Sequence, residues 1–148
     1  MGGLTEAPPA ASSFTNLLVD RKSATVAHVI FETTKHFPVE ERVFPHLRIR
    51  HSSRSVGAQI AEAWGKRRYV KHFLSKLTDA AAEVQETKHR IGIAASCQHV
   101  DSRPAARLRA DWSEIGRLLQ AMMWKAQLFS RPIAQPPEWP RRSDTTER

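Results

Sequence analysis

The most constraining feature of the chain is a seam of apolar and small residues between residues 73 and 94. Its members recur at alternating spacings of four and three residues: Phe73, Leu77, Ala80, Val84, Thr87, Ile91 and Ala94. Such spacings place side chains along one side of an α-helix, as in helices that pack lengthwise against one another. The seam therefore predicts a long helix over about residues 69–96 with one buried face. Glu86 and Arg90, one turn apart on another side, predict a surface ion pair.

Two more segments show the same helical periodicity. The seam that follows Pro104 consists of Leu108, Trp112, Ile115, Leu119, Met122, Ala126 and Phe129, and we expect Asp101 or Ser102 to cap this helix. An earlier helix begins between residues 39 and 45 and reaches Trp64, with Ile49, Ser53, Val56, Ile60, Ala63 and Trp64 within a sector of about 100°. Gly65 follows at once, and we expect it to end the helix with a positive φ.

The first helix is predicted over residues 16–36, and its three threonines and one serine make it a mediocre intrinsic helix former. Its apolar side consists of Leu18, Val26, Val29, Ile30, Thr33 and Phe37, and Pro38 ends it. Four amphipathic helices with short connections predict an all-α fold, an antiparallel up-and-down four-helix bundle over residues 16–130. Residues 1–15 are expected to be a disordered lead-in, and residues 131–148 a proline-rich disordered tail.

Positive charge is concentrated in one segment, residues 46–76, which we call the basic segment. The full chain has a formal net charge of +8, and the basic segment alone carries eight Lys or Arg against one acid, Glu62. The eight are Arg48, Arg50, Arg54, Lys66, Arg67, Arg68, Lys71 and Lys76. Clustered cations favour a polyanionic partner, so these residues are the predicted nucleic-acid-binding residues. We expect Glu62 to pair with a nearby arginine rather than to act in catalysis.

Apolar residues outside the core seams predict self-association. Phe44, Leu47 and Ala58 lie opposite the buried stripe of their helix, and Met123 and Trp124 fall off the seam of the last helix, whereas Trp112 and Met122 belong to its core side. Exposed apolar patches of this kind are rare on monomers. These five off-seam residues are therefore the predicted oligomer interface.

Enzymatic and metal-binding patterns do not occur in the sequence. The seven histidines include no pair spaced for a helical zinc site, and the single cysteine, Cys97, has no partner for a disulfide. No glycine-rich phosphate loop, nucleophile elbow or bilayer-length apolar run is present. We expect a cytoplasmic protein that is not an enzyme, with no cofactor, no metal and no membrane contact.

The central part of the chain resembles the four-helix bundle proteins of 23S ribosomal RNA intervening sequences, a group that includes the accessory variability proteins of diversity-generating retroelements. The residues that carry the resemblance are Phe37-Pro38, Glu40-Glu41-Arg42, Leu47, Ile49-Arg50, Ser55-Val56, Ile60-Ala61-Glu62, Gly65, Phe73-Leu74, Glu83 and Glu86-Thr87. The chain departs from the family pattern at Gly57, Gln59 and Ala63, where the family has proline, asparagine and glycine, which implies a straighter second helix.

The resemblance implies a ring-shaped pentamer with a basic surface, and for the retroelement members a reverse transcriptase as partner and nucleic acid as ligand. Together with the charge it leads to one functional expectation: a homo-oligomeric basic bundle that binds the backbone of RNA or DNA. Few aromatic residues lie near the cations, so base-specific recognition is not expected. The alternative is an interaction scaffold whose basic face binds an acidic protein.

Overall fold

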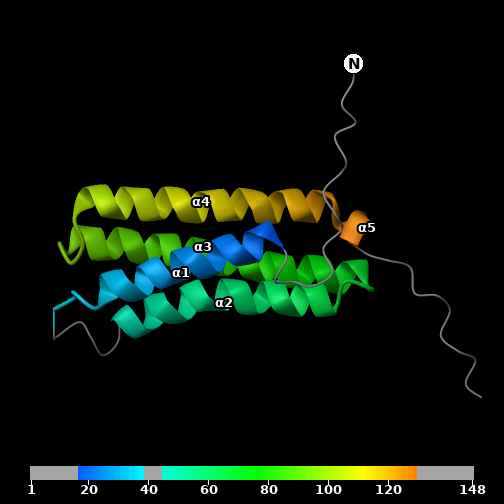
Figure 1. Cartoon of the computed structure of the whole chain (residues 1–148), viewed down its shortest axis with the longest axis horizontal. Coiled ribbons are helices and arrows are strands. Elements are labelled where there is room, and N and C mark those ends of the chain that lie inside the picture. The colour runs from blue at the N-terminus through cyan, green and yellow to red at the C-terminus, as the bar shows by residue number, and fades with distance from the viewer. Residues whose placement is uncertain (1–16, 39–44, 130–148) are drawn as a thin grey trace, which may run out of the picture.

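The computed structural model describes residues 17–38 and 45–129, and these form four long helices and one short one (Figure 1). In chain order they are α1 (Leu18–Thr34), α2 (Pro45–Gly65), α3 (Val70–Ser96), α4 (Ser102–Trp124) and α5 (Ala126–Phe129). Successive long helices run in opposite directions, and α1 packs against both α2 and α4, which closes the bundle. No strand occurs within these residues. The predicted all-α, antiparallel four-helix bundle is confirmed.

The core lies on the faces that the helical periodicity predicts. All seven residues of the α3 seam are buried, from Phe73 to Ala94. On α4 the predicted positions from Leu108 to Met122 are buried, with Trp112 fully enclosed at the centre. On α2 the predicted stripe is buried except for Trp64, which is half-buried. Full burial of a large apolar side chain contributes about 1.5–3 kcal/mol, so these three faces dominate the stability of the fold.

The prediction for α1 was partly wrong. Leu18 and Val29 were expected on the apolar side but are 53% and 42% exposed. The buried residues of α1 are Val19, Ser23, Ile30 and Thr34. The hydroxyls of Ser23 and Thr34 donate to the carbonyls of Asp20 and Phe31, at 2.8 and 3.0 Å. Because these hydroxyls are satisfied within the helix, two small polar residues can face the core, and the buried face is rotated relative to the apolar pattern.

The connection after α2 differs from the expectation at Gly65. No glycine of the described residues has a positive φ, so Gly65 simply forms the last residue of α2. The chain turns through hydrogen bonds that follow, from the Arg67 N–H to the Trp64 carbonyl at 3.2 Å and from the Tyr69 N–H to the Lys66 carbonyl at 3.0 Å. The left-handed position in the described chain is Gln98, with φ 60°, in the α3–α4 connection.

The last predicted helix is divided into two. Its cap is Asp101, although the Asp101 side chain makes no capping hydrogen bond, and the helix ends at Trp124 rather than near residue 130. After Lys125 the short helix α5 continues the seam, with Ala126 buried and Phe129 half-buried against the core. The Phe129 ring lies 5.9 Å from that of Phe73 on α3, so α5 closes this end of the bundle.

Gly92 and Ile91 give a matched test of this packing, because they are neighbours on different faces of α3. No atom lies within 4 Å of the position that a Gly92 side chain would occupy, and Ile91 is buried at 1% exposure. Gly92→Ala should raise the free energy of unfolding by about 0.5–1 kcal/mol through helix propensity. Ile91→Ala should lower it by about 2–5 kcal/mol. Urea unfolding followed by circular dichroism measures both, and a destabilising Gly92→Ala would contradict the open surface assigned to that position.

Candidate nucleic-acid interface

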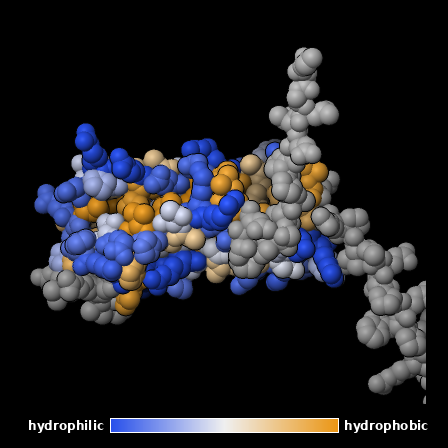
Figure 2. Space-filling view, in the orientation of Figure 1, coloured by the Kyte–Doolittle hydropathy of each residue, from blue (hydrophilic) through white to orange (hydrophobic). Residues whose placement is uncertain are grey.

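Five of the eight predicted binding cations are exposed and form no ion pair within the described residues, although the charge of Lys66 acts on Glu62. They are Arg48 and Arg54 on α2, Lys66 and Arg68 in the turn after it, and Lys71 in the first turn of α3, and all five are exposed. None of them forms an ion pair with any acid of residues 17–38 and 45–129. For Arg48 and Arg54 the position of the core explains this exposure, because burial of the Ile49–Ile60 stripe turns the other side of α2 toward solvent. Figure 2 shows hydrophilic residues over much of the face that includes α1 and α2.

Two of the other cations are bound to neighbours at the far end of α2. The Arg67 guanidinium donates to the Trp64 carbonyl at 2.9 Å and lies 4.3 Å from the centroid of the Trp64 ring. The Lys76 ammonium lies 2.7 Å from the Glu62 carboxylate and 3.8 Å from that of Asp79. This contact with Lys76 lowers the pKa of Glu62 and raises the pKa of Lys76. Glu62 thus forms an ion pair, as expected, but its partner is a lysine of α3 and not an arginine.

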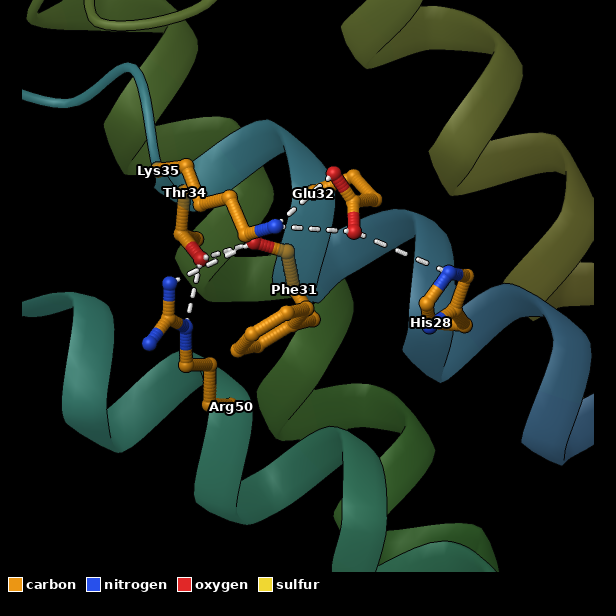
Figure 3. A network of polar contacts seen from close by, with 6 residues as sticks. All are labelled: His28, Phe31, Glu32, Thr34, Lys35 and Arg50. Atoms are coloured by element: carbon orange, nitrogen blue, oxygen red, sulfur yellow. Dashed lines mark hydrogen bonds and ion pairs between the residues drawn. The ribbon is translucent and has the colours of Figure 1, made fainter.

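Arg50 holds α2 against α1, a role that the sequence did not predict. Its Nε donates to the Thr34 hydroxyl at 2.7 Å, and its Nη2 donates to the Phe31 carbonyl at 3.3 Å (Figure 3). The guanidinium carbon also lies 4.4 Å from the centroid of the Phe31 ring. The Thr34 hydroxyl and the Phe31 carbonyl are partners that no charge pattern of the sequence identifies, because they lie 16 and 19 residues away along the chain.

The cations fall into two groups separated along α2. Arg50 and Arg54 lie beside the C-terminal half of α1, whereas Lys66, Arg68 and Lys71 lie at the α2–α3 turn. Twelve residues of helix separate Arg54 from Lys66, which corresponds to about 18 Å. The basic segment therefore offers two places for an anionic partner rather than one continuous patch.

A groove of about 630 Å³ runs between α1 and α2 beside the first of these groups. Small residues line most of it: Ser23, Ala24 and Ala27 from α1, and Ser53, Gly57, Ala58 and Ala61 from α2. Arg54, His28 and Phe31 line it together with Asp20, whose pKa is raised by partial burial. The groove thus combines a lining of mostly small residues with a cationic and aromatic region and one acid, Asp20.

The predicted interface residues occupy different environments. Trp124 is 82% exposed and Leu47 is 55% exposed, as expected for apolar residues outside the core seams. Ala58 is exposed and lies in the groove between α1 and α2. Met123 is half-buried against the core, with its sulfur 3.7 Å from the Thr78 hydroxyl. Phe44 lies outside the described residues.

Other kinds of site find little support in the part of the chain that the structure describes. No group of three or more His, Cys, Asp or Glu residues there is placed to hold a metal ion. None of the helices in that part combines the length and apolar character needed to cross a bilayer. Cys97 is exposed and not in a disulfide.

An acidic pair on α3 is a further titratable feature that the sequence analysis did not predict. Burial, followed by the charge of Glu86, raises the pKa of Glu83. The Arg90 guanidinium, 2.6 Å from the Glu86 carboxylate as the spacing predicts, lowers the pKa of Glu86. Oε2 of Glu83 is shielded from solvent and has no hydrogen-bond partner within the described residues. The three-residue spacing of the two carboxylates was the signal available in the sequence.

Comparison with known proteins identifies relatives of the fold. The family of the 23S rRNA-intervening sequence protein matches residues 15–121. Among solved structures, a protein of unknown function from the S23 ribosomal protein family of Bacteroides thetaiotaomicron is 25% identical, with a TM-score of 0.66. The similarity covers 72% of this chain and 96% of that protein. No protein of curated function matches the chain significantly.

The Glu83–Glu86 pair predicts opposite effects of two isosteric substitutions. Burial holds the Glu83 pKa above its ordinary value of 4.5, so its ionisation opposes folding as the pH rises. Glu83→Gln should therefore be more stable than the wild type at pH 7. Glu86 has a lowered pKa, so it stabilises the fold above the ordinary value of 4.5, and Glu86→Gln should be less stable at pH 7.

Both differences should shrink when urea unfolding is repeated below the ordinary carboxyl pKa, because each wild-type carboxyl is then mostly protonated in the unfolded chain. His51 and Arg90 are the other charged groups that act on Glu83, and His51→Gln is a useful control for the contribution of that ring. A Glu83→Gln variant that is less stable than the wild type at pH 7 would contradict the assigned burial.

Proposed function

The chain belongs to the family of the 23S rRNA-intervening sequence protein, and from that premise we propose that it is a non-enzymatic, homo-oligomeric bundle that binds the phosphate backbone of nucleic acid. A cytoplasmic location is part of this proposal. The resemblance to retroelement accessory proteins further implies a reverse transcriptase as a partner. The solved relative is itself described as a protein of unknown function, so the proposal depends on the residues of this chain.

The observation that carries the proposal is the set of five exposed cations without an acidic partner among the described residues. They come from a segment with eight Lys or Arg and one acid, and that acid is already paired with Lys76. A phosphate backbone neutralises several such cations at once and releases its own counterions, which favours binding of any sequence. In a homo-oligomer the same cations occur once in each subunit, so a long polyanion could contact several copies.

An acidic protein surface is the alternative partner for the same cations. It would also bind more weakly at high salt, so salt dependence alone does not separate the two partners. Binding to a random duplex or RNA does separate them, because a protein scaffold has no reason to bind free nucleic acid tightly. We favour nucleic acid because the two cationic groups, about 18 Å apart along α2, suit an extended strand with a charge at each nucleotide.

The exposed apolar residues support self-association. Trp124 lies at the end of α4, whereas Leu47 lies near the beginning of α2, and these are opposite ends of the bundle (Figure 1). Contact between such unlike patches on successive copies is head-to-tail, and it forms a closed ring when the rotation between copies permits. This arrangement agrees with the pentameric ring that the family resemblance implies.

Charge removal within and outside the basic segment tests nucleic-acid binding. Arg48, Arg54, Arg68 and Lys71 are all exposed, so their simultaneous replacement by Gln should change stability by less than about 0.5 kcal/mol for each residue. The variant should bind a random 20-base-pair duplex and a 20-nucleotide RNA more weakly. Its plot of log affinity against log salt should flatten by up to about 0.9 for each phosphate that the variant no longer neutralises.

The matched control removes four exposed arginines of α4 instead, Arg103, Arg107, Arg109 and Arg117. Fluorescence anisotropy at several salt concentrations compares the two variants, which have the same net charge. Equal reductions of affinity would mean that the protein is merely basic, and a wild type that binds neither probe at low salt would contradict the proposed function.

Apolar-to-polar substitutions test self-association. Trp124→Ser and Leu47→Ser should each reduce the mass of the particle in light scattering, because each removes one side of a head-to-tail contact. Ile93→Ser is the matched control, since Ile93 is 52% exposed on α3 but is not part of the predicted interface. A wild type that scatters as a 16.7 kDa monomer at micromolar concentration would contradict the oligomer.

A further inference from the structure

Three cationic side chains surround a single aromatic ring, that of Phe31 near the end of α1. The Arg50 guanidinium lies 4.4 Å from the centroid of the Phe31 ring, the Lys35 ammonium 4.7 Å and the Arg54 guanidinium 5.5 Å. Lys35 reaches the ring from the same helix, whereas the two arginines reach it from adjacent turns of α2. Figure 3 shows Lys35 at the end of α1 and Arg50 reaching toward Phe31 from α2.

The positive charge of this cluster is only partly balanced. Glu32 is the acid that contacts it within the described residues, and the Glu32 carboxylate lies 3.1 Å from Lys35 and 3.7 Å from His28. Arg50 and Arg54 have no acidic partner in that part of the chain. Two guanidinium groups held beside one ring repel each other, and an anion between them relieves that repulsion.

Contacts within the fold position these guanidinium groups before any ligand arrives. Two of the nitrogens of Arg50, Nε and Nη2, are fixed by Thr34 and by the Phe31 carbonyl, whereas Nη1 donates to none of the described residues. Arg54 has no hydrogen bond to the described residues but lies over the ring. Positioned side chains lose less rotamer freedom on binding. By contrast, Lys66, Arg68 and Lys71 at the other end of α2 form no side-chain hydrogen bond or ring contact with the described residues, unlike Arg67.

We propose that Arg50, Arg54 and Lys35 form a phosphate-binding site around Phe31, and that this site, not the α2–α3 turn, makes the strongest backbone contact with nucleic acid. The inference rests on the proposed function and assigns it to one site. The ligand group is a phosphodiester, which accepts several hydrogen bonds from guanidinium donors. The adjoining α1–α2 groove, with Ala27 and Gly57 in its lining, leaves room for the sugar next to that phosphate.

Arg54 and Phe31 are the positions that test the site. Arg50 is unsuitable because its replacement also breaks the contact between α1 and α2. Arg54→Gln removes one exposed charge, and Phe31→Leu removes the ring but leaves the net charge unchanged. Arg68→Gln is the comparison variant, because Arg68 is an exposed arginine of the second cationic group, at the other end of α2, and its loss should weaken binding less. Thermal unfolding by circular dichroism verifies that each variant is folded.

Anisotropy with the 20-nucleotide RNA and the random 20-base-pair duplex, at 50 mM KCl, gives the first measurement. Arg54→Gln should weaken binding by roughly tenfold, as expected for loss of a charge-assisted hydrogen bond. Phe31→Leu should weaken it by roughly threefold or more at constant charge, because the guanidinium groups lose their common support. Arg68→Gln should also weaken binding, but by less than Arg54→Gln, by roughly twofold to threefold. Equal effects of Arg54→Gln and Arg68→Gln, with none from Phe31→Leu, would overturn the inference.

A second measurement separates failure of the site from failure of the proposed function. Pyrophosphate is titrated into ¹⁵N-labelled wild-type protein, and the Nε–H signals of Arg50 and Arg54 should shift with saturation while that of Arg68 shifts less. If these shifts occur but neither nucleic acid binds, the anion site is supported and the proposed function is wrong. If nucleic acid binds but the Arg50 and Arg54 signals do not respond, the site is wrong. Binding to phosphatidylglycerol vesicles in place of both nucleic acids would overturn the assignment to a nucleic-acid phosphate.

Discussion

The packing of α3 between α2 and α4 is the constraint on which the rest of the structure depends. The seven buried positions of α3 face both neighbours, and α5 closes over one end of the same face. Each large side chain buried there contributes about 1.5–3 kcal/mol, whereas an exposed ion pair contributes about 0–1 kcal/mol. The positions of α2 and α4 are therefore set by apolar burial. The exposed charged residues contribute little to stability, so they can bind a partner without loss of the fold.

That packing also decides which cations are available to a partner. One face of α2 is buried against α3, and polar contacts between these two helices use Lys76, Glu62 and the buried pair Ser52 and Thr87, whose hydroxyls lie 2.9 Å apart. A second face meets α1 and uses Arg50. The remaining cations, such as Arg54 and Arg68, form no ion pair or hydrogen bond between the described helices. Their lack of acidic partners within the described residues is thus a consequence of the core and not of charge alone.

The sequence predicted those elements whose burial follows from apolar side chains alone. The faces of α3 and α4 were predicted residue by residue, because large apolar groups at spacings of three and four have one stable arrangement. The buried face of α1 was not, because Ser23 and Thr34 satisfy their hydroxyls within the helix and become compatible with the core. For the same reason an apolar residue such as Val29 could remain partly exposed. The apolar pattern of a sequence does not show whether a Ser or Thr hydroxyl is hydrogen-bonded within its own helix and can therefore be buried.

The candidate site shows a similar limit. The segment that carries the cations could be identified from composition, but the division between bound and free cations could not. It depends on contacts between helices, such as that of Arg50 with Thr34, and on the ring of Phe31, which no charge pattern singles out. Helix α1 is thus held to α2 partly through the same arginine that faces a prospective ligand. A phosphate bound at Arg50 and Arg54 would interact with the native bundle and not with the unfolded chain, so by linkage it would also strengthen the attachment of α1.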